Sequence, residues 1–170
     1  MTTRIYSWIL LFTGALTITA CAPMTETPVP SAGKVYNGEY AGTPFIMATD
    51  NSVNVVEQFI QAYNDMNVEK MSSFMADTVI VYDYTGARAE LTKTALEEYM
   101  AGMDSVRQDI YATIPVMLEN GDRVSVLVDS QEWRWGTDGS EWRKRLWERI
   151  IVDNGKIVGV RQWSRDVGGM

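Results

Sequence analysis

Few side chains in this sequence are suited to acid–base, nucleophilic or metal chemistry. The chain contains no histidine and one cysteine, so the commonest metal ligand and the commonest general base are both missing. Zinc sites, non-haem iron sites and histidine-dependent triads are therefore disfavoured. The sequence also contains no phosphate-binding glycine loop, GxSxG turn or calcium loop. We expect neither a metal nor a cofactor.

Asp83 is the strongest catalytic candidate among the remaining groups, as a general base. It lies near the end of a strand-like run, and a carboxylate in an apolar pocket has a raised pKa that suits proton transfer. The competing interpretation is a turn aspartate ahead of Gly86. Tyr63 and Tyr82 could donate hydroxyl hydrogen bonds, although tyrosines at such spacings more often belong to a core.

Tryptophan and arginine alternate in the C-terminal part of the chain. Residues two apart on a strand share a face, so Arg145 lies in one row with Trp147, and Arg161 lies with Trp163 on the next strand. Facing a pocket, these rows would suit a planar or apolar ligand that carries a carboxylate or phosphate. On the outer face of the sheet, the arginines would instead pair with glutamates and the tryptophans would form a dimer interface. The glutamates concerned are Glu132, Glu141 and Glu148. A register shift of one residue exchanges the two faces, so both interpretations stay open.

Helical patterns come first along the chain and strand-like patterns follow. Apolar spacing predicts helices over 53–66, 68–74 and 92–106. A β-branched and aromatic run predicts a strand over 78–84. Three Asn-Gly or Asp-Gly turns separate four more strands of an antiparallel meander, over 108–118, 123–135, 140–152 and 156–166. This order indicates an α+β fold.

Two segments of the sequence carry a family resemblance. VEQFIQAYNDMNVEKMSSFMADTVIVYDYTG and the closing VDNGKIVGVRQWSRD resemble the SnoaL-like branch of the nuclear transport factor 2-like superfamily. The resemblance covers residues 50–167 and implies a cone in which N-terminal helices pack on a curved antiparallel sheet. It also implies a pocket at the open end of the cone. The ligand-binding residues that it suggests are Phe59, Tyr63, Arg145, Trp147, Arg161 and Trp163.

The same resemblance bears on catalysis. Steroid isomerases of this fold use an aspartate as base, and a helix tyrosine with a protonated acid as oxyanion donors. Those positions fall on Asp83, on Phe59 and near Trp147, so the base is retained and both donors are lost. Because such donors contribute orders of magnitude in rate, we expect no steroid isomerase activity.

The N-terminal segment has the pattern of an export signal. A basic start and an apolar stretch lead to Ile18-Thr19-Ala20-Cys21, which resembles a bacterial lipobox. We expect residues 1–20 to be a lipoprotein signal peptide, Cys21 to carry the lipid, and residues 21–50 to form a flexible tether before the domain at 51–170. Ala22 after the cysteine favours, by resemblance, the outer membrane facing the periplasm in a Gram-negative host.

Charge and fold together limit the function. The net charge of −7 argues against nucleic acid as a partner. We favour a lipid-anchored domain that binds a small apolar or acidic molecule without turning it over. An isomerase, dehydratase or cyclase with Asp83 as base is the second hypothesis. A protein-interaction module is the third, and a homodimer is expected under all three.

Overall fold

The computed structural model describes residues 31–167, which form three helices and eight strands. The helices are α1 (Asn51–Asn64), α2 (Val68–Phe74) and α3 (Lys93–Ala101). The strands are β1 (Ser31–Lys34), β2 (Pro44–Met47), β3 (Met75–Tyr82), β4 (Arg88–Leu91), β5 (Met103–Leu118), β6 (Val124–Gly136), β7 (Glu141–Asp153) and β8 (Lys156–Asp166). None of the three helices is long and apolar enough to cross a membrane. The predicted signal peptide and Cys21 lie outside the described residues.

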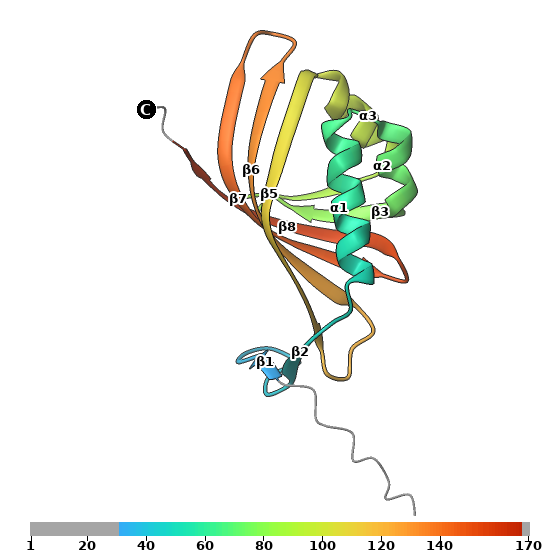
Figure 1. Cartoon of the computed structure of the whole chain (residues 1–170), viewed down its shortest axis with the longest axis vertical. Coiled ribbons are helices and arrows are strands. Elements are labelled where there is room, and N and C mark those ends of the chain that lie inside the picture. Colours follow the sequence, from blue (N-terminus) through green and yellow to red (C-terminus); the bar gives the residue numbers. More distant parts are fainter. Residues whose placement is uncertain (1–30, 168–170) are drawn as a thin grey trace, which may run out of the picture.

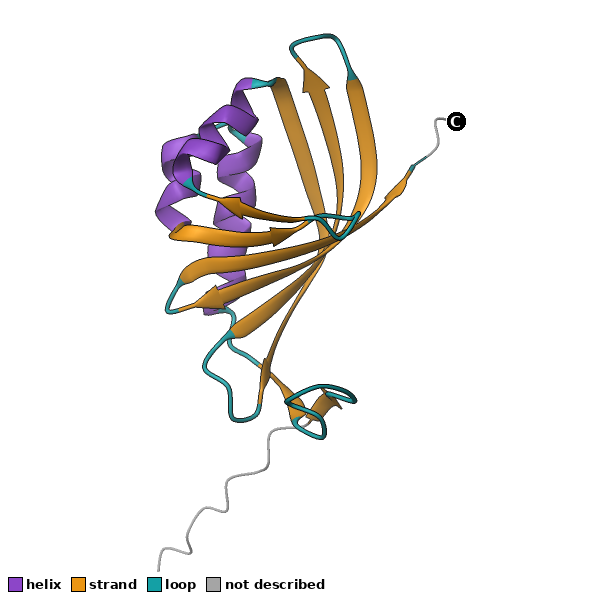
Figure 2. Cartoon of the chain, turned by 180° about the vertical axis from the view of Figure 1, so that it is seen from behind, coloured by secondary structure: helices purple, strands orange, loops and turns teal. Residues whose placement is uncertain are grey.

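One curved, unclosed sheet contains all eight strands, in the order β1-β2-β5-β6-β7-β8-β3-β4. The helices lie together on its concave side (Figures 1 and 2). The predicted meander is confirmed, since β5 to β8 pair in sequence order and antiparallel. β3 pairs parallel with β8, so the sheet is not antiparallel throughout. The α+β cone is confirmed.

Two predicted segments differ from the structure. The third helix ends at Ala101 instead of 106, because the chain from Met103 onward pairs with β6 and forms the long strand β5. The predicted tether contains a β1–β2 hairpin, and β2 adds to the sheet beside β5. The apolar residues Phe45 and Ile46 of β2 are half-buried there, which explains why this segment is too apolar for a spacer.

The helices begin and end where the local sequence allows. Asn67 caps α2 by accepting a hydrogen bond from the Lys70 backbone N–H at 2.9 Å, and Thr92 caps α3 in the same way. Between β7 and β8, Asn154 and Gly155 both have positive φ, as a two-residue type I′ hairpin requires.

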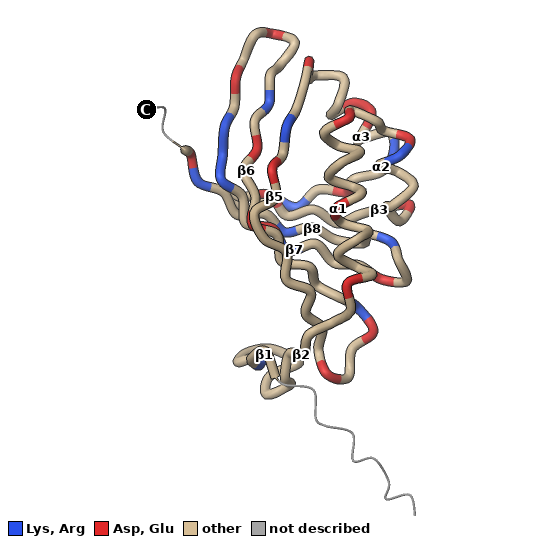
Figure 3. Tube along the Cα trace, in the orientation of Figure 1, with Lys and Arg blue, Asp and Glu red and all other residues tan. Residues whose placement is uncertain are grey.

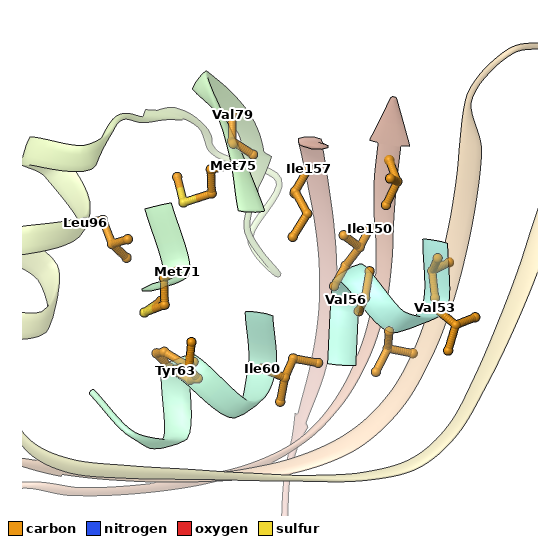
Figure 4. Close-up of a cluster of buried hydrophobic side chains, with 14 of the residues drawn as sticks. Val53, Val56, Ile60, Tyr63, Met71, Met75, Val79, Leu96, Ile150 and Ile157 are labelled. Carbon is orange, nitrogen blue, oxygen red and sulfur yellow. The ribbon is translucent and has the colours of Figure 1, made fainter. Parts of the chain in front are cut away.

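The core lies between α1 and the concave face of the sheet (Figure 4). Apolar residues of α1 recur every three or four positions and are buried, as the helical period requires. They pack with apolar side chains of the other helices and of the inner strand faces, including Met71, Val79, Leu96, Ile150 and Ile157. This packing holds the helices against the sheet and leaves a cavity at one end.

Candidate functional site

A cavity of about 490 Å³ lies between all three helices and the concave face of the sheet. Its walls are mainly apolar, with Phe59, Met71, Val81, Leu91, Leu96 and Val160 among them. Tyr99 of α3 and Trp142 of β7 also line it. A largely apolar cavity with a few convergent polar groups is the usual form of a small-molecule site.

One group of polar side chains centres on Glu132 of β6, which is almost fully buried. The Tyr63 hydroxyl from α1 donates to Glu132 Oε1 at 2.6 Å, and Arg134 Nη2 donates to Oε2 at 2.7 Å. Arg134 also stacks on the Trp142 ring, with its guanidinium carbon 4.1 Å from the ring centroid. Burial and the charge of Glu132 raise the pKa of Tyr63 well above its ordinary value, so this hydroxyl keeps its proton at neutral pH.

A second group centres on Glu148 of β7. Gln108 Nε2 donates to Glu148 Oε2 at 2.7 Å, and Gln162 Nε2 donates to Oε1 at 3.1 Å. Burial, and after it the nearby charge of Glu132, raise the pKa of Glu148 to about 7, against the opposing effect of these hydrogen bonds and of Arg134. Glu148 can therefore hold or release a proton near neutral pH.

Asp83 lines the cavity but is held as a turn residue. Its Oδ1 accepts from the Thr85 hydroxyl at 2.6 Å, from the Thr85 N–H at 2.8 Å and from the Ala87 N–H at 3.0 Å. These hydrogen bonds lower the pKa of Asp83, led by the one from Thr85. A stabilised carboxylate is a weaker proton acceptor, so the geometry favours the turn interpretation over the general base.

The structure separates the predicted ligand-binding residues into two groups. Phe59 and Tyr63 line the cavity, as expected. The remaining four do not, which corrects their placement in the pocket: Trp147 and Trp163 are half-exposed, and Arg145 and Arg161 share their faces of β7 and β8. Their strand neighbours face inward instead, so the two rows lie on the outer face of the sheet. The four residues are Arg145, Trp147, Arg161 and Trp163.

The sequence did not predict that the cavity's principal polar residues face inward. One of the two open interpretations paired Glu132 and Glu148 with arginines on the outer face, but both glutamates point inward. Glu148 follows Trp147 directly, so the acid expected to be lost from this strand is present one residue further on. Leu146 and Ile150 could have revealed this, because both are apolar and share a face of β7 with Glu148.

The donor set suits hydrogen bonding and proton transfer. Among residues 31–167, no cluster of three or more metal-ligating side chains is found. Arg134 is the one cavity-lining arginine, and Glu132 already neutralises it. Arg134 Nε is buried and has no hydrogen-bond partner within the described part of the chain. The cavity thus offers a titrating carboxyl group, a buried carboxylate and a partly exposed guanidinium group.

Comparison with known proteins identifies the fold and the family. An LEH-like epoxide hydrolase of M. tuberculosis is similar, with a TM-score of 0.57 and 16% identity over 69% of this chain and 84% of that one. An NTF2-like protein of unknown function in nutrient uptake from Rhodospirillum rubrum is also similar, with a TM-score of 0.55. It is 21% identical, and the match covers 66% of this chain and 97% of that one. AusH from Aspergillus nidulans has a TM-score of 0.54 and 13% identity, and the match covers 73% of this chain and 90% of that one. At these identities the similarity shows the fold alone.

No curated protein matches the chain. A family model for the SnoaL-like domain does match it, over residues 56–160, which run from α1 into β8. This range includes nearly all of the cavity-lining residues. The chain therefore belongs to the SnoaL-like domain family, with the NTF2-like fold that its resemblance predicted.

Proposed function

We propose that this domain binds a small, mainly apolar molecule in the cavity between its helices and sheet. The observation that carries the proposal is the cavity itself, about 490 Å³ in volume and walled chiefly by apolar side chains. Such a volume holds a molecule of drug-like size. Its polar groups converge from α1, β5, β6, β7 and β8, so they can orient a single bound molecule.

The polar groups also limit the chemistry of the ligand. An acidic ligand would meet two buried glutamates, and the arginines that favoured such a ligand lie on the opposite face of the sheet. A neutral ligand fits better. A hydroxyl or N–H group would donate to Glu148 or Glu132, and a carbonyl or ether oxygen would accept from the Arg134 guanidinium, whose side chain is 23% exposed. We therefore favour an apolar molecule with one or two uncharged polar groups.

Filling the cavity tests this proposal. Ala95 of α3 lines the cavity, and Ala95→Trp would occupy part of its volume. We expect this variant to bind the fluorescent probe N-phenyl-1-naphthylamine at least about tenfold more weakly than the native chain, because the probe and the indole compete for the same apolar space. The measurement is a fluorescence titration with the full chain.

Ala101→Trp is the matched control, because Ala101 lies on the same helix, is exposed and does not line the cavity. It adds the same indole and should leave probe binding unchanged. Equal affinity in both variants would show that the probe binds elsewhere and would contradict the proposed ligand site. Circular dichroism of both variants checks that the fold is kept.

A second candidate function is an acid–base enzyme that uses the same cavity. The observation that favours it is Glu148, whose pKa of about 7 suits a group that takes up and releases protons near neutral pH. In this form of the hypothesis Glu148 replaces Asp83 as the proton-transferring group. Tyr63 keeps its proton and holds Glu132 in place.

We further propose that the domain is exported and anchored by a lipid on Cys21. This proposal rests on the order of residues 1–21 and on the position of the single cysteine. Cys21→Ser should abolish metabolic labelling of the chain by a fatty-acid analogue and release it from the membrane fraction. Labelling that persists in this variant would contradict the anchor.

A further inference from the structure

The outer face of the sheet carries a patch of arginine and tryptophan that the cavity does not use. We call it the outer Arg–Trp patch and define it as Arg145, Trp147 and Arg149 of β7 with Arg161, Trp163 and Arg165 of β8. The strand register sets these residues directly opposite one another, as Arg145 and Arg165, Trp147 and Trp163, and Arg149 and Arg161. The result is a tryptophan pair between two arginine pairs. A shallow hollow of about 850 Å³ lies over the tryptophans and the first arginine pair.

The positive charge of this patch is only partly neutralised. Arg145 forms a bidentate ion pair with Asp129, with Nε 2.7 Å from Oδ1. No carboxylate in residues 31–167 lies within 4.0 Å of Arg149, Arg161 or Arg165. Figure 3 shows a long blue stretch on β7, where basic residues follow one another along the strand. The patch is thus a basic surface on a chain whose net charge is −7.

The unneutralised positive charge is clearest at Arg149 and Arg161. Like charges placed opposite each other across two strands are destabilising. Burial lowers the pKa of Arg149, and the charge of Arg161 lowers it further. Arg149 Nε finds only the neutral Ser125 hydroxyl, at 3.0 Å. An anion between the two guanidinium groups would remove this repulsion, and phosphate suits it because its oxygens match the guanidinium fork.

The tryptophans add a second, independent observation. Trp147 and Trp163 are 52% and 51% exposed, although indole is the largest apolar side chain. Tyr111 and Ile114 of β5 are also exposed, and the Arg145 guanidinium stacks on the Tyr111 ring at 3.9 Å. Indole rings prefer the boundary between the lipid headgroups and the acyl chains of a bilayer, where one edge meets water.

From these two observations we propose that the outer Arg–Trp patch docks on an anionic phospholipid surface. The arginines would bind lipid phosphates, and the two indoles would lie at headgroup depth between them. A second copy of the chain is the other occupant that would cover the tryptophans, and the light-scattering measurement below distinguishes it from lipid. A free inorganic anion would satisfy the arginines but would leave the tryptophans exposed.

The test measures how close the patch lies to lipid. The full chain is mixed with phosphatidylcholine vesicles, with or without phosphatidylglycerol, whose acyl chains are brominated near the headgroup to quench tryptophan fluorescence. The contribution of the patch is the quenching lost in Trp147→Phe/Trp163→Phe, because any contact by another part of the chain is common to both proteins. We expect this contribution only with phosphatidylglycerol, and we expect it to fall at high salt.

Charge variants identify the groups that carry the interaction. Arg149→Gln/Arg161→Gln should weaken the phosphatidylglycerol-dependent association by about tenfold or more, since each arginine at an anionic surface adds severalfold to the affinity. Arg88→Gln/Arg123→Gln is the matched control. Both of its arginines pair with carboxylates away from the patch, so it loses the same number of charges and should bind as the native chain does.

Three outcomes would overturn the proposal. The first is quenching of the patch tryptophans that does not depend on phosphatidylglycerol, or no quenching at all. The second is an equal loss of binding in the two double variants, which would indicate a general charge effect. The third is a dimer in light scattering that dissociates in Trp147→Ala/Trp163→Ala, which would assign the patch to a second copy of the chain.

Discussion

Glu132→Ala is expected to lower the free energy of unfolding by about 3 kcal/mol at neutral pH. Glu132 is 1% exposed, and its carboxylate accepts one hydrogen bond from the Tyr63 hydroxyl and another from the Arg134 guanidinium. Removing it leaves a buried hydroxyl without an acceptor and a largely buried cation without its counter-charge. Breaking a fully buried pair costs about 3–5 kcal/mol, and we take the lower end because the Arg134 side chain stays 23% exposed. Urea unfolding of the two proteins measures the difference.

Two variants show whether this loss comes from the buried contacts. Glu132→Gln keeps an oxygen acceptor for Tyr63 and the volume of the side chain, so it should cost less than the alanine variant. Glu90→Ala removes an exposed glutamate that pairs with Arg88, and it should change the stability by no more than about 0.5 kcal/mol. A Glu132→Ala variant as stable as Glu90→Ala would show that the group around Glu132 is not held as the structure has it.

The second large effect is a dependence of stability on pH that arises from Glu148. Its pKa rises from 4.5, the ordinary value that it has in the unfolded chain, to about 7 in the folded protein. The folded state therefore binds more protons than the unfolded state between these two values. The contribution of Glu148 to stability is fully present below pH 4.5 and is lost as the pH rises to 7. A shift of this size corresponds to a loss on the order of 3 kcal/mol.

Glu148→Gln isolates this contribution, because glutamine keeps the shape and does not titrate. The stability of the variant relative to the native chain should increase between pH 4.5 and pH 7, and urea titrations across this range measure it. Glu90→Gln, at an exposed position, should show no such change. A constant difference between Glu148→Gln and the native chain at every pH would contradict the raised pKa. If the cavity also performs acid–base chemistry, Glu148→Gln should abolish turnover and retain probe binding.

The sequence alone determined most of the elements of this fold. Helical spacing predicted α1 and α2, and the three glycine turns separated the four strands of the meander. These signals are local, since a helical face repeats within one turn and a type I′ turn needs positive φ at neighbouring residues. The resemblance in the first and last segments then predicted the family. Neither kind of signal could show that β3 pairs with β8 or that β2 joins β5, because those contacts form between distant parts of the chain.

The tertiary structure decided which residues face the cavity. The alternation along β7 showed that Arg145 and Trp147 share one face and that Leu146 and Glu148 share the other, but it did not show which face the helices cover. The helices cover the face with Leu146 and Ile150, because burying these aliphatic side chains removes apolar surface from water. That choice places Glu132 and Glu148 in the cavity and the outer Arg–Trp patch in solvent. The sequence also could not show whether Asp83 acts as a base or as a turn residue. Its pKa depends on the hydrogen bonds that the folded β3–β4 turn supplies.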